Sequence, residues 1–132
     1  METRKKPVSI VYDDNMNPLG VKIETLDENF TIALTPIDNG HLYTWHEAMD
    51  RLKELGLQGI SKKQMALITA YNIEVDAALM QAGGSRLRAE WSVGEYYSSS
   101  AWLYYPAYGA MDVDYKCYAY QVRPLLASKE TD

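Results

Sequence analysis

The sequence predicts an α+β fold, and three features of the chain support this class. Short segments rich in β-branched residues occur first, between residues 8 and 34. Apolar residues spaced three or four apart follow between residues 45 and 82, and strand-like segments separated by turns return after residue 89. A chain of 132 residues suits one domain that buries roughly two-thirds of its unfolded surface. We therefore expect a single domain over residues 1–132, with residues 1–7 as a flexible N-terminal tail.

Three strands are expected at the start of the chain, at residues 8–12, 21–26 and 29–34, because turns rich in Asp and Asn separate them. Residues 13–24 place oxygen-bearing side chains at the spacing of a calcium-binding loop. However, Pro18 occupies the position where that loop needs Gly, and strands rather than helices flank it. We interpret this region as a polar hairpin turn.

Two or three helices are expected next, beside a small, mostly antiparallel sheet with long loops. Capping boxes at residues 44–47 and 61–64 begin the first two helices, and Asn72 is expected to cap a third. Gly56 and Gly83 stand where the first and third helices end. The pattern of apolar residues predicts these core side chains: Trp45, Met49, Leu52, Ile68, Leu79, Trp91 and Trp102.

Charge and hydropathy narrow the classes of partner. The formal net charge of −5 argues against nucleic acid, whose binding depends on clustered Lys and Arg. No apolar run approaches the length needed to span a membrane, and the charged N-terminal segment lacks the apolar stretch of a secretory signal. The single cysteine cannot form an internal disulfide, which leaves the cellular compartment undetermined.

Motifs for metal binding and catalysis are not recognisable. His46 and Glu47 would need a second His at position 50 to form a zinc motif, and that residue is Asp50. Cys117 has no recognisable base for a nucleophilic role, and the phosphate-binding and dinucleotide-binding glycine motifs do not occur. We therefore expect no metal, no cofactor and no catalytic residues, and a protein that is not an enzyme.

The stretch from residue 91 to residue 124 is the feature around which the chain is organised. It contains eight of the eleven tyrosines, two of the three tryptophans and the cysteine, but no Phe. Tyr mixed with Ser, Gly and Asp is typical of antibody combining sites, where Tyr supplies contact area at low entropic cost. The composition therefore favours a binding surface over an ordinary core.

Framework residues between the tyrosines form a set that extends over roughly residues 42–127. The set comprises residues 44–49, the second capping box, residues 72–84, residues 98–102, and Trp91, Ser92, Glu95, Tyr96, Gly109, Lys116, Val122, Arg123 and Pro124. This set resembles the variable proteins of diversity-generating retroelements, whose best-known relative is a phage tropism determinant. The resemblance implies a C-type lectin fold of the formylglycine-generating-enzyme type. It also implies a location on a phage virion or bacterial cell surface and a protein or glycan ligand.

In such proteins, adenine-directed mutagenesis changes codons that begin with two adenines, within a fixed framework. The resemblance implies that Trp91, Trp102, Gly109, Val122 and Pro124 belong to the framework of the variable, ligand-binding region 91–124. It implies these diversified, ligand-binding positions: Val93, Gly94, Ser99, Ser100, Leu103, Tyr105, Ala107, Tyr108, Ala110, Asp112, Asp114, Tyr115, Cys117, Tyr118, Ala119 and Tyr120.

The sequence departs from the family pattern at several points. Pro106 stands where an apolar aromatic residue is usual, and residues 59–61 are Gly-Ile-Ser in place of Leu-Pro-Thr. The Glu-Pro-Asn and Trp-Asn-Asp motifs of calcium-dependent sugar-binding lectins do not occur, so we expect no calcium-dependent sugar binding. The paired catalytic cysteines of formylglycine-generating enzymes have no counterpart.

Two alternatives remain open at this point. The chain could be a structural or adhesin domain of the same fold, in which the aromatic stretch is core or an assembly interface. Asp112 and Asp114 could also be a carboxylate pair for acid–base chemistry, a weak cation site or a solvated strand face, although we interpret them as ligand-contacting residues.

Strand alternation predicts which side chains form the binding surface. If Trp102 and Tyr104 point into the core, Leu103 and Tyr105 point to solvent. Asp112 and Asp114 should share a face opposite Met111 and Val113. For Tyr118 and Tyr120 to reach solvent, a loop or bulge must intervene before Gln121. We expect these outward residues to form one exposed patch with Tyr108 and Tyr115.

Overall fold

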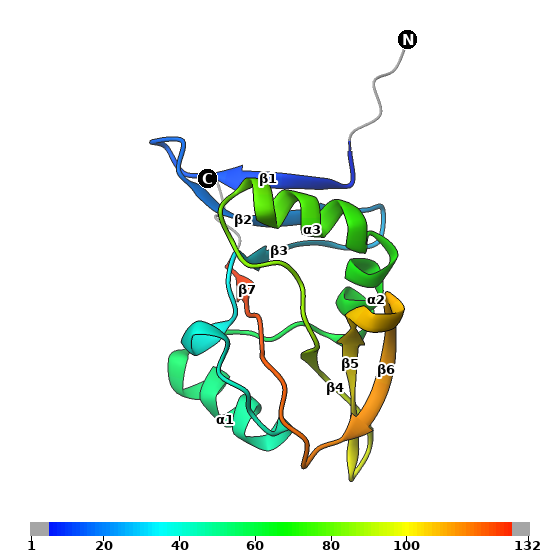
Figure 1. Cartoon of the computed structure of the whole chain (residues 1–132). Helices are drawn as coiled ribbons and strands as arrows, with labels where there is room; N and C mark the ends of the chain where they lie inside the picture. Colours follow the sequence, from blue (N-terminus) through cyan, green and yellow to red (C-terminus); the bar gives the residue numbers. More distant parts are fainter. Residues whose placement is uncertain (1–5, 128–132) are drawn as a thin grey trace.

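The computed structural model describes residues 6–127. Three strands from the first part of the chain and one from its end form a four-stranded sheet. Its strands are β1 (Val8–Tyr12), β2 (Pro18–Glu24), β3 (Asn29–Ala33) and the short β7 (Leu125–Leu126), and Figure 1 shows them in the upper half of the view. Their order is β1-β2-β3-β7, with every neighbouring pair antiparallel. The end of the chain therefore returns to complete the sheet that its beginning starts.

The turn between β1 and β2 is the polar hairpin that the sequence predicts. One carboxylate oxygen of Asp13 accepts hydrogen bonds from the N–H groups of Asn15 and Asn17, at 2.8 and 2.9 Å. Met16 takes a positive φ of 64°, which closes the turn. Residues 1–5 of the expected N-terminal tail lie outside the described residues. Pro7 is already part of the sheet, because its carbonyl accepts the N–H of Glu24.

Three helices follow: α1 (Trp45–Leu55), α2 (Lys62–Ala70) and α3 (Asn72–Gln81). Both predicted capping boxes are present at the starts of α1 and α2. The prediction that Asn72 caps α3 is wrong. Asn72 already has helical geometry, and its side-chain amide instead donates to the carbonyl of Thr69 in the last turn of α2.

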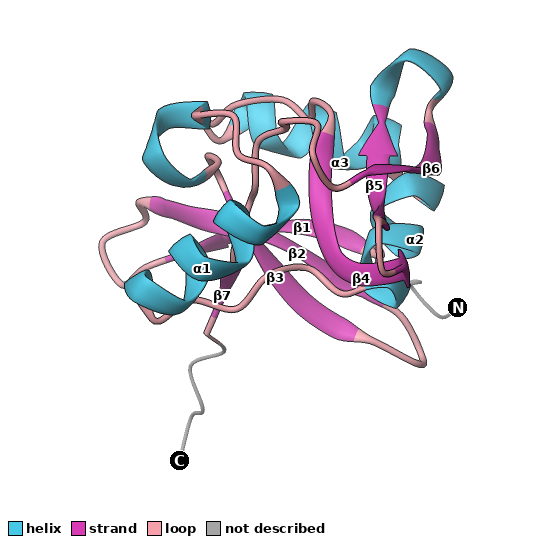
Figure 2. Cartoon of the chain, turned by 90° about the horizontal axis from the view of Figure 1, so that it is seen from below, coloured by secondary structure: helices cyan, strands magenta, loops and turns pink. Residues whose placement is uncertain are grey.

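A second, three-stranded antiparallel sheet contains most of the tyrosine-rich stretch. Its strands are β4 (Glu90–Tyr97), β5 (Ser100–Tyr105) and β6 (Ala110–Tyr115), in the order β4-β5-β6. A short 3-10 segment, Pro106–Tyr108, joins β5 to β6. Figure 2 shows the two groups of strands in magenta with α1 and α2 beside them. The described residues are therefore an α+β structure of three α-helices and two small antiparallel sheets.

Two hydrophobic clusters hold these elements together. The first lies between the four-stranded sheet, α2 and α3 and also receives Tyr104 of β5. The second lies between α1 and the three-stranded sheet and includes Leu103 of β5. Of the predicted core residues, Trp45, Leu52, Ile68, Leu79 and Trp91 are buried, and Met49 packs against the second cluster. Trp102 is only half-buried.

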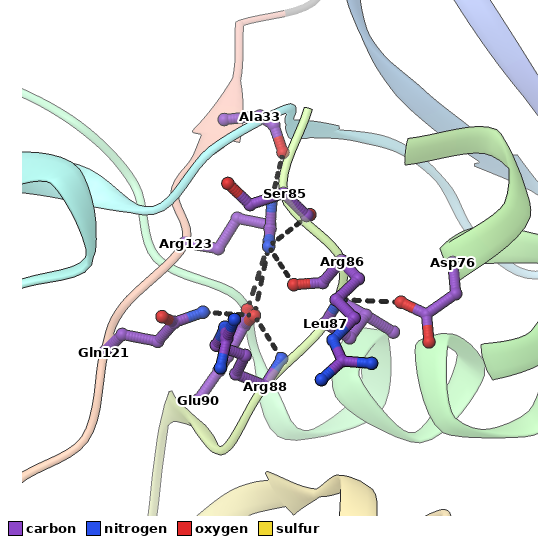
Figure 3. A network of polar contacts seen from close by, with 9 residues as sticks. All are labelled: Ala33, Asp76, Ser85, Arg86, Leu87, Arg88, Glu90, Gln121 and Arg123. Atoms are coloured by element: carbon purple, nitrogen blue, oxygen red, sulfur yellow. Dashed lines mark hydrogen bonds and ion pairs between the residues drawn. The ribbon is translucent and has the colours of Figure 1, made fainter. Parts of the chain in front are cut away.

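A buried ion pair connects the two sheets at the point where the C-terminal segment passes between them (Figure 3). The guanidinium group of Arg123 binds the carboxylate of Glu90 at 3.1 Å, and both side chains are almost completely buried. Arg123 also donates to the carbonyls of Ala33 and Ser85, while the side-chain amide of Gln121 donates to Glu90. Each of the two buried charged groups therefore has several hydrogen-bonding partners, as a stable buried ion pair requires.

Candidate functional site

The register between β5 and β6 determines which predicted site residues share a face. Leu103 pairs with Asp112, and Ala101 pairs with Asp114. Paired residues in an antiparallel sheet point to the same side, so both aspartates lie on the Leu103 face. Met111 and Val113 consequently lie on the opposite face, as strand alternation predicts.

The prediction that Leu103 points to solvent is wrong, because its side chain is 0% exposed. Helix α1 covers this face of the sheet, and α2 covers the other, where Tyr104 is 2% exposed. Trp102 is half-buried, and its ring centroid lies 5.4 Å from that of Tyr96 and 4.5 Å from the Nζ atom of Lys62. Ser100 is also buried. Ser100 and Leu103 are therefore not available to a ligand in this structure, and we remove them from the candidate site.

The accessible tyrosines around β6 form the surface that we call the tyrosine face: Tyr105, Tyr108, Tyr115, Tyr118 and Tyr120. The rings of Tyr105 and Tyr108 lie 5.5 Å apart, and those of Tyr115 and Tyr118 lie 6.0 Å apart. Tyr120 lies within electrostatic range of Tyr105 in the first pair and of Tyr118 in the second. Tyr108, Tyr115 and Tyr118 are 77%, 59% and 53% exposed, so they form the outer part of the face.

Tyr120 forms the inner, half-buried part of the tyrosine face. Its hydroxyl donates to the carboxylate of Asp114, and its ring meets that of Trp91 edge-on at 5.0 Å. Its backbone exchanges two hydrogen bonds with Tyr43, at 2.8 and 2.9 Å. Burial raises the pKa of the Tyr120 phenol, and the Asp114 carboxylate raises it further. Tyr120 is therefore a protonated, fixed support for the more exposed rings.

The loop after β6 is held by a buried lysine. The Nζ atom of Lys116 forms an ion pair with Glu95 at 2.5 Å and donates to the carbonyl of Ser98 at 3.0 Å. It also lies 4.4 Å from the ring of Trp45, where the cation is attracted to the aromatic face. The expected loop before Gln121 is present here, and it carries Tyr118 outward.

The structure brings together only part of the predicted set. Asp112 is exposed at the edge strand, and the following predicted positions are exposed around the tyrosine face or in the adjoining turns: Ser99, Ala107, Cys117 and Ala119. Ala110 is half-buried at the start of β6. Val93 and Gly94 lie on β4, two strands away from β6, where Gly94 is close to Lys62. They are therefore separate from the tyrosine face.

Sequence reasoning did not include two aromatic features near these residues. Tyr43 supports Tyr120 from a position 77 residues earlier in the chain, and no local pattern indicates this contact. Tyr96 and Tyr97 form a second exposed aromatic group, with their rings 4.6 Å apart. Tyr96 also contacts Trp102, so this group belongs to the α2 side of the sheet.

Comparisons of the chain with protein-family models, with curated proteins and with solved structures find no match. Within residues 6–127, no cluster of three His, Cys, Asp or Glu side chains is arranged to hold a metal ion. None of the helices in the same residues has the length and apolarity required to cross a membrane.

Proposed function

We propose that this chain is a ligand-binding module and not an enzyme, and that the tyrosine face is its binding surface. The observation that carries the proposal is the grouping of accessible tyrosines into two ring pairs, Tyr105–Tyr108 and Tyr115–Tyr118, at the ends of β5 and β6 and in the segments that follow them, with Tyr120 within electrostatic range of both pairs. An exposed aromatic patch on a polar surface usually marks an interaction site. Tyr is also among the residues that contribute most to binding energy.

The tyrosine face is held in place by hydrogen bonds, an ion pair and ring contacts, and this order favours ligand binding. Tyr120 is held by Asp114 and Trp91, and the loop that carries Tyr118 is held by Lys116. A surface already ordered before binding loses less conformational entropy when the ligand arrives. The phenol groups can then contribute both apolar contact and hydrogen bonds.

We propose further that the chain has the C-type lectin fold of retroelement-diversified proteins and that its ligand is a protein or glycan on another cell or on a phage host. The exposed positions Tyr108, Tyr115 and Tyr118 support this assignment, because their side chains belong to neither hydrophobic cluster, whereas Tyr105 and Tyr120 pack against the second. Asp112 adds a carboxylate at the rim, so the surface has both aromatic and acidic character.

Binding to whole cells tests the proposed surface. The purified, labelled chain is titrated onto a panel of intact bacterial strains, and Tyr108→Ala, Tyr118→Ala and Tyr97→Ala variants are compared on any strain that binds. Tyr97 is 67% exposed and lies outside the tyrosine face, so it is a matched control for Tyr108. We expect the first two changes to weaken binding at least about tenfold, the loss typical of hot-spot tyrosines, and the control to have little effect. Equal losses for Tyr97 and Tyr108 would contradict the assignment.

The DNA around the gene tests diversification independently. We expect a nearby repeat that matches the codons for residues 91–124 and differs only at adenines, together with a reverse-transcriptase gene. A repeat whose differences from this region are spread over all four bases would reject the retroelement mechanism while leaving the binding surface open to the cell assay.

A further inference from the structure

Strand β1 is at the edge of the four-stranded sheet and offers backbone groups for pairing. The Pro7 carbonyl accepts the N–H of Glu24 in β2. Because successive residues of a strand direct these groups to opposite sides, the N–H and C=O groups of Val8 and Ile10 point away from β2. Figure 1 shows β1 as the outermost strand of the described chain. Exposed edge strands are commonly protected against pairing by charged side chains. The sequence of β1, VSIVY, contains none.

A groove with a volume of about 470 Å³ lies beside this edge, between β1 and α3. Its β1 wall includes Val8, Ile10 and Tyr12. Its α3 wall consists of Ala77 and Ala78 between Glu74 and Gln81. The small alanine side chains allow another element to approach closely. Tyr12 is 45% exposed and lines the groove, so a large aromatic side chain and a partly apolar groove occur on the same surface.

The two ends of β1 carry opposite charges. Lys6 lies at the N-terminal end and lines the groove, whereas Asp14 follows the C-terminal end and is exposed. In an antiparallel pair of identical strands, the N-terminal end of each lies beside the C-terminal end of the other. Lys6 of one copy would then lie beside Asp14 of the second. Parallel pairing would instead place like charges together.

We propose that two copies of this chain associate through antiparallel pairing of their β1 strands. The two four-stranded sheets become one continuous sheet of eight strands, and Tyr12 of each copy enters the groove of the other. The surface is self-complementary in backbone groups, shape and charge, as a two-fold interface requires. Strand β1 is at the opposite end of the molecule from the loop that follows β6 (Figure 1), so the part of the tyrosine face in that loop stays accessible in both copies. Such a dimer would bind multivalent surfaces with increased avidity.

Sedimentation equilibrium on the full chain tests this proposal over a range of micromolar concentrations. We expect the apparent mass to rise from 15.0 kDa toward twice that value as concentration increases. Ile10→Pro removes an N–H that points away from β2, so the hydrogen bonds between β1 and β2 are kept while pairing at the outer edge is blocked. We expect this variant to stay monomeric, and the matched control Ile10→Val to dimerise as the wild type does.

A charge exchange tests the antiparallel arrangement and covers the case in which Ile10→Pro does not fold. Lys6→Glu should raise the dimer dissociation constant by up to about tenfold, since each dimer contains two such pairs. Combining Lys6→Glu with Asp14→Lys should restore wild-type association, which a loss of folding would not do. A wild-type chain that is monomeric throughout, a folded Ile10→Pro variant that still dimerises, or a charge exchange without recovery would each overturn the proposal.

Discussion

Leu103 and Tyr104 are consecutive residues of β5, and each is buried in a different hydrophobic cluster. Their side chains point to opposite faces of the three-stranded sheet, and a helix covers each face. This arrangement confines the candidate binding surface to the β6 edge, the turn before β6 and the loop after it. The middle strand of the aromatic stretch is therefore mostly scaffold, and only Tyr105, its last residue, belongs to the tyrosine face.

Truncating a side chain to Ala should lower the free energy of unfolding far more in β5 than on the exposed part of the tyrosine face. We expect Leu103→Ala to lower the free energy of unfolding by about 2–5 kcal/mol, because it leaves a cavity in a packed cluster. Tyr108→Ala should change it by no more than about 0.5 kcal/mol, since that ring is mostly exposed. Chemical denaturation of both variants measures the difference. Similar large losses at both positions would favour a structural role for the whole aromatic stretch.

The buried ion pair should be sensitive to loss of one partner. We expect Arg123→Met to destabilise the fold by about 3–5 kcal/mol, because it leaves the Glu90 carboxylate buried without its cation. The control is Arg51→Met, which breaks the more accessible pair with Asp38 and should lower the free energy of unfolding far less, because solvent screens exposed charges. Urea denaturation measures the free energy of unfolding of both variants. Equal losses would contradict the expectation that the buried pair is the more costly one to break.

Lys116 should control the order of the loop that carries Tyr118. We expect Lys116→Met to increase amide hydrogen exchange in residues 116–120, because the bonds to Glu95 and Ser98 are lost. The exposed Lys63→Met is the matched control and should leave this exchange unchanged. Protection that is the same in both variants would show that packing alone orders the loop.

Tyr120 should ionise later than an ordinary tyrosine in an alkaline titration. Its pKa is raised above the usual value of 10.0 by burial and by the bonded Asp114 carboxylate. Since the folded-state pKa is raised, this interaction stabilises the fold at neutral pH, and its contribution is lost as pH rises through the folded pKa. Tyrosinate absorbance should therefore show a late component that Tyr120→Phe reduces. An unchanged late component would argue against the Tyr120–Asp114 bond.

Local sequence patterns were sufficient to predict much of the fold. The strand at residues 8–12, the polar hairpin after it and both capping boxes are present as predicted. The shared face of Asp112 and Asp114 also follows from simple alternation. Asn72 marks the limit of such reasoning, because its side chain bonds to the preceding helix rather than capping its own.

The sequence by itself therefore determined the class of fold, the helix starts and the alternation of side chains along β6, because these depend on residues within a few positions of one another. The tertiary structure alone decided that both faces of β5 are buried, that Arg123 pairs with Glu90, and that Tyr43 supports Tyr120. Alternation assigns two residues to opposite faces, but it does not state what covers each face. That depends on helices and strands distant in the chain, and their packing determines which tyrosines remain in contact with water.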